Sequence, residues 1–341
     1  MHNFSGYFGK SQTSSIFDSK LQLSEGRVFA FSLDQDIFKT ETENAILISS
    51  ASILYSGFSA EKALLRLAED IACFPENANQ ILESISGHFC LAILCKDNET
   101  LYLVCDKTGT QSIYYAEKDG DVCFGTKLSA LLKHAPDLKN IHPQSIFQYV
   151  YFHCIPAPDT IYQHVKKLKC GGFRSFGRSK LNQTYFVPRF SDTRDTESNL
   201  QTRLLEELES SVNRSLDGLD ISRTGAFLSG GLDSSTVAGF FAKKAGPQKA
   251  QTFTIGFDAE GYDESTFAKI SADHFQTKHH VYYVTPGDIE EALTKISAYY
   301  DEPFGNSSAL PAYYCARFAR EHDIDTLLAG DGGDELFAGN E

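Results

Sequence analysis

The residues whose types and spacing point most clearly to chemistry are the eight at 228–235, Leu-Ser-Gly-Gly-Leu-Asp-Ser-Ser. The apolar run Ala226-Phe227-Leu228 predicts a buried strand that enters this stretch. Apolar residues at helical spacing from Thr236 to Ala245, followed by Gly246-Pro247, predict a helix that leaves it. A helix N-terminus offers unpaired N–H groups and the positive end of a dipole, so this strand-to-helix turn is a candidate seat for a polyphosphate.

The side chains of this turn suit a phosphate–metal complex. Gly230 and Gly231 permit tight backbone geometry and close approach of a ligand, and Ser229, Ser234 and Ser235 supply hydroxyl groups. Asp233 would repel phosphate unless a cation lies between them, and Mg²⁺ is the hard divalent cation expected there. The alternative is an ordinary glycine–serine turn in which Asp233 only caps the helix.

A second acidic glycine turn lies near the end of the sequence. The strand expected at Ile324 to Leu328 leads into Ala329-Gly330-Asp331-Gly332-Gly333-Asp334. Clustered carboxylates repel one another, and a shared metal removes that repulsion. We therefore expect Asp334 to join Asp233 as a ligand of Mg²⁺. Strands and helices alternate after residue 224, which predicts a parallel sheet with ligands beyond the carboxyl ends of its strands.

The string SGGLDSS resembles the pyrophosphate-binding loop of the N-type ATP pyrophosphatases and is most similar to that of the asparagine synthase family. The resemblance implies that ATP is cleaved between its α and β phosphates while the loop holds the departing pyrophosphate. It assigns adenine contacts to the backbone of Leu228 and Ile255, ATP contacts to Ala329 and Gly330, and a place near the acyl-adenylate to Asp331. The Walker-like string at 172–179 has arginine where lysine is needed, and we interpret it as a surface turn.

The first half of the chain resembles the N-terminal glutaminase domain of the same family, a type 2 glutamine amidotransferase with an Ntn-type β-sandwich. The resemblance rests on Gly87-His88-Phe89, on Asp106 through Tyr115 and on Phe124-Gly125-Thr126-Lys127. Family members open with Met-Cys-Gly-Ile-Phe-Gly, and the cysteine is their nucleophile. Here Ser5-Gly6-Tyr7-Phe8-Gly9 is the matching piece, so the cysteine position holds Ser5. Its nitrogen is an amide and its hydroxyl is far less acidic than a thiol, so we expect no glutaminase nucleophile.

The resemblance implies two domains, a degenerate amidotransferase domain at 1–190 and an α/β ATP pyrophosphatase (HUP-like) domain at 191–341. A polar loop at Ser191 to Ser198 would join them. Asp301 to Pro311 resembles the family segment D-E-P-x-x-x-S-S-x-P, where Ser307 or Ser308 could either cap a helix or help to shape the ATP pocket. Family members continue through a helical part with a catalytic lysine, so we expect the second domain to be incomplete.

Composition narrows the classes of function. The formal net charge of −14 argues against a binder of nucleic-acid backbone, and no run of about 18 apolar residues predicts a membrane span. The eight cysteines include no C-x-x-C pair, which favours buried free thiols in a reducing cytoplasm. The three lysines at 166, 167 and 169 are expected to form a solvated face.

Together these features predict an ATP-dependent ligase that activates a carboxylate as acyl-AMP and transfers it to ammonia or an amine. The carboxylate would belong to a small molecule or a peptide, and a homodimer is the assembly considered. One rival is a relative that has abandoned glutamine, such as a β-lactam synthetase or a lasso-peptide cyclase. The other is a catalytically incomplete nucleotide-binding fragment or regulatory subunit.

Overall fold

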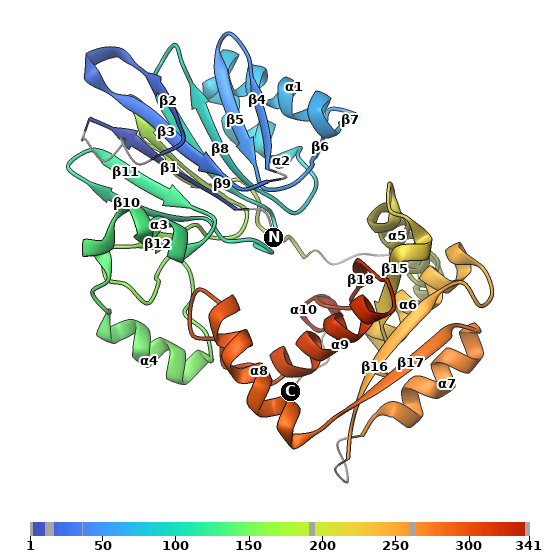
Figure 1. Ribbon diagram of the computed structural model, residues 1–341. Helices are drawn as coiled ribbons and strands as arrows, with labels where there is room; N and C mark the ends of the chain where they lie inside the picture. Colours follow the sequence, from blue (N-terminus) through green and yellow to red (C-terminus); the bar gives the residue numbers. More distant parts are fainter. Residues whose placement is uncertain (1–2, 11–16, 36, 191–194, 259–262, 338–341) are drawn as a thin grey trace. The chain divides into compact units, whose positions relative to one another are not determined.

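The computed structural model describes residues 3–10, 17–35, 37–190, 195–258 and 263–337 (Figure 1). The chain forms two compact units. The first comprises Met1–Phe190 and Tyr300–Gly305, and the second comprises Ser191–Tyr299 and Asn306–Glu341. The chain therefore returns once to the first unit, through a segment that the sequence analysis assigned to the second domain. Residues 191–194 of the expected joining loop lie outside the described residues.

The first unit is built on two antiparallel sheets of six strands each. One sheet has the order β12 (Lys166–Lys167), β10 (Tyr114–Lys118), β11 (Asp121–Gly125), β1 (Phe4–Gly9), β3 (Val28–Leu33) and β2 (Ser19–Gln22). The other has the order β14 (Asn182–Thr184), β13 (Gly172–Gly177), β9 (Thr100–Cys105), β8 (Cys90–Cys95), β5 (Ala45–Ser49) and β4 (Phe38–Glu41). One buried cluster takes residues from both, including Phe8, Phe31, Ile48 and Leu103. The two sheets thus pack face to face as a sandwich.

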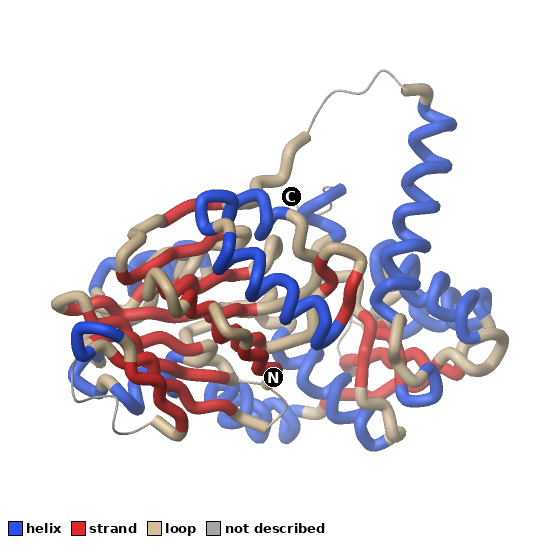
Figure 2. Tube along the Cα trace, turned by 90° about the horizontal axis from the view of Figure 1, so that it is seen from above, coloured by secondary structure: helices blue, strands red, loops and turns tan. Residues whose placement is uncertain are grey.

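Helices cover the outer faces of this sandwich, and Figure 2 shows them beside the two sheets. Helix α1 (Ala60–Cys73) and helix α2 (Ala78–Glu83) bury Leu64, Leu67 and Leu82 in a cluster with residues of the second sheet. Helix α3 (Leu128–His134) buries Leu131 in a cluster that includes Tyr114 of the first sheet. The remaining elements of the unit are helix α4 (Pro143–Phe152) and the small hairpin of β6 (Leu54–Tyr55) and β7 (Phe58–Ser59).

The second unit has a parallel sheet in the order β17 (Lys278–Val284), β16 (Gln251–Phe257), β15 (Thr224–Phe227) and β18 (Thr326–Leu328). Helices α5 (Glu197–Leu216), α6 (Leu232–Ala245) and α7 (Ser265–Phe275) share one buried cluster with β15 and β18. Helices α8 (Pro286–Tyr299) and α9 (Ala309–Glu321) take part in two other clusters, which include residues of β16 and β17. A last short helix, α10, spans Gly333–Phe337. The mixed α/β class expected from the sequence is confirmed.

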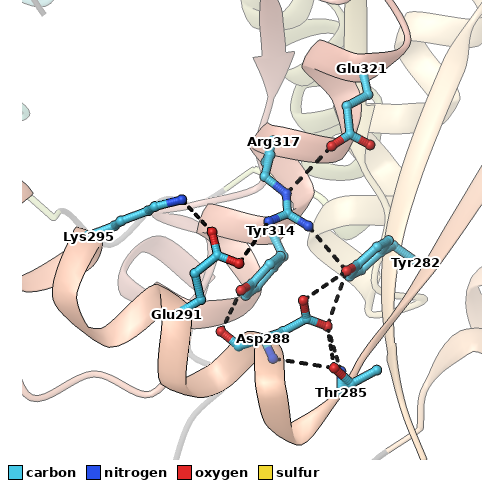
Figure 3. Close-up of polar contacts among 8 residues, drawn as sticks. All are labelled: Tyr282, Thr285, Asp288, Glu291, Lys295, Tyr314, Arg317 and Glu321. Carbon is cyan, nitrogen blue, oxygen red and sulfur yellow. Dashed lines mark hydrogen bonds and ion pairs between the residues drawn. The ribbon is translucent and has the colours of Figure 1, made fainter.

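A polar network fastens helix α8 to its neighbours (Figure 3). The backbone N–H of Thr285 donates to the Asp288 carboxylate at 2.8 Å, and the backbone N–H of Asp288 donates to the Thr285 hydroxyl at 3.3 Å, which together form a capping box. The Tyr282 hydroxyl of β17 donates to the same carboxylate at 3.1 Å. Arg317 of α9 donates to that hydroxyl at 3.2 Å, and its guanidinium lies 4.6 Å from the ring centroid of Tyr314.

Two local interpretations of the sequence are wrong. The Walker-like string is strand β13, which pairs with β9 and β14 and buries Phe173 and Phe176, whereas a surface turn was expected. Of the three lysines expected on a solvated face, Lys167 lies on the short edge strand β12. Its side chain is only 15% exposed and pairs with Glu302 at 2.6 Å.

Other expectations concern the thiols and the membrane. All eight cysteines are free, and Cys90, Cys95, Cys105 and Cys315 are buried. Burial raises the pKa of the Cys95 and Cys315 thiols to about 12, which keeps them protonated. Within the described residues, no helix is long and apolar enough to cross a membrane.

Candidate nucleotide-binding site

The turn between β15 and α6 is held by its own serines. The Ser229 and Ser234 hydroxyl oxygens lie 2.9 Å apart, and the backbone N–H of Ser229 donates to the Ser234 hydroxyl at 3.2 Å. The backbone N–H of Gly231 donates to the Ser229 hydroxyl at 3.3 Å. These bonds bring two of the predicted hydroxyl groups to the N-terminus of the 14-residue helix α6, whose first N–H groups have no partner within the helix.

Ser235 is oriented differently. Its hydroxyl lies 3.1 Å from the Ser271 hydroxyl of helix α7. It therefore joins α6 to α7, whereas Ser229 and Ser234 stay at the turn. No local pattern in the sequence marked Ser271, because a serine in the middle of an amphipathic helix is common on solvated faces.

The two glycines of the turn have different surroundings. Gly230 has φ +87°, and a Cβ there would lie 2.6 Å from both the backbone nitrogen of Ala268 and the Phe267 Cβ. Only glycine fits, because α7 packs directly on the turn. At Gly231 a Cβ would meet only the Ser229 hydroxyl, at 3.3 Å. The surroundings of Gly231 are thus less crowded than those of Gly230.

Hydrogen bonds with the neighbouring strand β16 hold Leu228, the first residue of the turn. The backbone N–H of Leu228 donates to the Phe253 carbonyl of β16 at 2.9 Å, and the Leu228 carbonyl accepts a hydrogen bond from the Thr254 hydroxyl. Thr254 was missed by the sequence analysis, although a buried threonine within an apolar strand could have marked it. The next residue, Ile255, is half-buried, pairs with Tyr282 of β17 and packs in the clusters with α8 and α9; its contact with adenine stays a prediction.

The second acidic turn packs on the first. A Cβ at Gly330 would lie 2.8 Å from the backbone carbonyl carbon of Asp233, and a Cβ at Gly333 would lie 2.3 Å from a carboxylate oxygen of Asp233. Strand β18 pairs in parallel with β15, and its carboxyl end delivers Ala329 and Gly330 beside α6. Two turns that are about 100 residues apart in the sequence are therefore in contact.

This contact places the predicted metal ligands on neighbouring segments. Asp233 is in the first turn of α6, and Asp334 is an exposed residue in the first turn of α10, next to Gly333. Asp331 is exposed in the turn that leads to α10. The described residues hold no cluster of three or more His, Cys, Asp or Glu side chains suited to a metal. Mg²⁺ commonly binds through one or two carboxylates together with substrate phosphates, and the metal role of Asp233 and Asp334 stays a prediction.

The segment that returns to the first unit has its own anchoring contacts. The Asp301 carboxylate accepts hydrogen bonds from the backbone N–H groups of Leu128 and Ser129, at 3.0 and 3.3 Å. The Glu302 carboxylate accepts from the backbone N–H of Ile161 at 3.0 Å as well as from Lys167.

At the start of α9, the side-chain oxygen of Asn306 accepts from the backbone N–H of Ser308 at 2.8 Å. Ser308 occupies the N-cap position of α9, but its side chain makes no capping hydrogen bond.

Ser5 lies in strand β1 of the first unit and is only 5% exposed. Its hydroxyl is 3.2 Å from Nε2 of His134, the last residue of α3. The His134 ring stacks on Phe17, with ring centroids 4.1 Å apart. Burial, with a smaller contribution from the charge of Lys133, lowers the pKa of His134 below its ordinary value. Sequence analysis missed His134, because 129 residues separate it from Ser5.

Parts of both units match known protein families. Residues 203–341 match the family model "Asparagine synthase", and residues 70–187 match the model "Glutamine amidotransferase domain". The chain belongs to the asparagine synthase family. A putative glutamine-hydrolysing asparagine synthetase of Methanocaldococcus jannaschii is 33% identical over 269 residues, which are 76% of this chain and 50% of that protein. Asparagine synthetase 1 of Bacillus subtilis is 29% identical over 79% of this chain and 42% of its own length.

A putative asparagine synthetase of Mycobacterium tuberculosis is 31% identical over 76% of this chain and 40% of its own length. The chain thus spans about half the length, or less, of the curated relatives that it matches. Family models thus match both kinds of domain expected from the sequence.

Proposed function

We propose that this asparagine synthase family chain binds Mg·ATP and activates a carboxylate as acyl-AMP, which ammonia or an amine then converts into an amide. The observation that carries the proposal is the packing of the two acidic glycine turns, in which Gly330 and Gly333 lie against Asp233. The names of the relatives support the reaction class, since they are described as asparagine synthetases. The acceptor would be the carboxylate of a small molecule or a peptide.

Each residue of the site has a distinct role in this proposal. Ser229, Ser234 and the N–H groups at the start of α6 would hold the departing pyrophosphate by hydrogen bonds. Asp233 and Asp334 would hold Mg²⁺, which when bound would neutralise charge that develops on the pyrophosphate. Gly231 would allow close approach of the phosphates. The backbone of Leu228 and Ile255 would contact adenine, Ala329 and Gly330 would contact ATP, and Asp331 would lie near the acyl-adenylate.

The test is ATP–pyrophosphate exchange with a panel of carboxylic acids, in the presence of Mg²⁺. Exchange that depends on one acid is expected, and it would name the substrate class. Exchange that depends on an acid already bearing an amine would favour the lactam-forming or peptide-cyclising rival. Tight ATP binding without exchange for any acid would contradict the ligase and favour the nucleotide-binding alternative.

We also propose that the first unit does not hydrolyse glutamine. The support is the serine at the cysteine position, within strand β1, where its amide nitrogen cannot act as the free amine base. Glutamate release from glutamine should stay at the level of a Ser5→Ala variant. Turnover by the unmodified chain that disappears in Ser5→Ala would overturn this proposal.

A further inference from the structure

Ser5 and His134 have the geometry of a nucleophile and its base. A serine hydroxyl is a weak nucleophile unless an adjacent base accepts its proton. The structural signature of such a pair is hydrogen-bond contact between the two and a third group that orients the base, which here is the Phe17 ring rather than a polar side chain. The 3.2 Å separation of Ser5 Oγ and His134 Nε2 meets the contact condition. Strand β1, paired on both sides with β3 and β11, holds Ser5, while helix α3 carries the histidine.

The His134 ring has a restricted orientation. Phe17 stacks on it, and its Nδ1 atom is buried without a hydrogen-bond partner within the described residues. The lowered pKa of His134, caused first by burial, keeps the imidazole neutral near pH 7, where it can accept a proton. The charges of Lys133 on α3 and Asp18 before β2 act on this ring. Two pockets border His134, and the other Asp, Glu, Lys and His side chains that line them are Asp34, Glu117, Lys118, Asp119, Asp121, Asp137 and His164.

A pocket gives a small molecule access to the pair. It has a volume of about 390 Å³ and is lined by Ser5 and His134 together with Asp18, Ser32, Asp34 and Lys133. Asp34 accepts a hydrogen bond from the side-chain amide of Asn3 at 3.1 Å. A volume of this size lies within the range of small-molecule sites and accommodates a short acyl group with its leaving group.

A second serine–histidine contact in the same unit shows what distinguishes the pair. Ser145 Oγ lies 3.1 Å from His142 Nδ1, but the same hydroxyl donates to the Thr160 carbonyl at 2.7 Å and the residue is fully buried. Its proton is committed to a backbone carbonyl, as in a purely structural contact. Among the described residues, the hydroxyl of Ser5 has His134 as its hydrogen-bond partner.

We propose that Ser5 and His134 form an acyl-transfer site for small esters in the first unit. Ser5 Oγ attacks the ester carbonyl carbon while its proton passes to His134 Nε2. The bond between the acyl carbon and the alcohol oxygen breaks, and the proton passes to the departing alkoxide. Water then attacks the acyl-serine with the histidine as base, which releases a carboxylic acid and restores the Ser5 hydroxyl. Esters are favoured over amides because an alkoxide leaves more readily than an unprotonated amide nitrogen, so this proposal is independent of glutamine hydrolysis.

The test is covalent labelling with a fluorophosphonate, followed by mass spectrometry to locate the modified serine, together with hydrolysis of p-nitrophenyl acetate. Phosphonylation is expected at Ser5 and not at Ser145. Ser5→Ala should abolish labelling and His134→Gln should slow it about 100-fold or more, while Ser129→Ala, an exposed serine on the same helix, should leave it unchanged.

The unmodified chain supplies a measurement that is independent of whether the variants fold. Its labelling rate should fall as the pH drops below the lowered pKa of His134, because a protonated imidazole cannot act as the base. Labelling of Ser145 or of scattered serines with no preference for Ser5 would overturn the proposal. A labelling rate that does not change as the pH is lowered over the range in which the chain stays folded would do the same.

Discussion

Gly330→Ala is expected to separate the two acidic turns and to weaken Mg·ATP binding. The added Cβ would lie 2.8 Å from the carbonyl carbon of Asp233 and 2.9 Å from the backbone nitrogen of Ser234. Ordinary contacts begin near 3.4 Å, and the neighbouring atoms are mostly backbone within the first turn of α6, which cannot rotate away. Overpacking of this kind costs about 1–3 kcal/mol.

If that cost is relieved by displacing the second turn, the binding free energy of Mg·ATP falls by a similar amount. Since each 1.4 kcal/mol is a factor of ten, we expect affinity to drop roughly 5- to 150-fold. Isothermal titration calorimetry with ATP in excess Mg²⁺ measures the drop. Urea unfolding of the same samples shows whether the variant is folded.

Gly332→Ala is the matched control in the same turn. Gly332 has φ +94°, but a Cβ there would meet no atom within 4 Å. The substitution should cost about 1–2 kcal/mol of stability through backbone strain and change ATP affinity little. Wild-type affinity in a folded Gly330→Ala protein would refute the reasoning, and so would equal losses of affinity in the two variants.

Three further outcomes are expected from the same structure. Lys167→Ala should lower the free energy of unfolding by about 3 kcal/mol, because Glu302 is left buried without its cation. Lys166→Ala, at a more exposed ion pair, should lower it by less than about 1 kcal/mol. Urea unfolding measures both. Burial, with a neighbouring histidine, lowers the pKa of His280 to about 4. The unfolded state therefore binds more protons between pH 6.5 and 4. The free energy of unfolding should decrease as the pH is lowered from 6.5 to 4, by about 1 kcal/mol after solvent screening of a partly exposed ring. In His280→Gln that part of the pH dependence should be absent. Thr285→Ala should remove one half of the capping box of α8 and lower stability by about 1 kcal/mol in the same assay.

The sequence was sufficient where local pattern decides the structure. Strand β15, Thr224–Phe227, enters the turn as the apolar run Ala226-Phe227-Leu228 predicted. Helix α6 ends before Gly246, as the glycine–proline pair predicted. The strand–turn–helix around Ser229 to Ser235 follows from the same signals. The nucleotide and metal roles of its residues stay predictions.

The sequence was insufficient where a partner from elsewhere in the chain decides the structure. Strand β13 was predicted to be a surface turn, but it lies within a sheet, where its Arg174 guanidinium lies over the Tyr115 ring, 5.0 Å from its centroid, and pairs with Glu117. Lys167 looked solvated because its partner Glu302 is 135 residues away. These contacts depend on the register and packing of the sheets, which no local pattern encodes.

The most direct test of the central claim is Mg²⁺-dependent ATP affinity in single Asp→Asn variants of the two acidic turns. If Asp233 and Asp334 both hold the metal, each variant should bind Mg·ATP at least about tenfold more weakly than the unmodified chain, a change of ~1.4 kcal/mol. Asp273→Asn is the matched control, since Asp273 is an exposed acid of the same unit whose ion pair with Lys269 is 2.9 Å long. It should bind normally. Unchanged Mg²⁺-dependent affinity in both Asp233→Asn and Asp334→Asn would contradict the account.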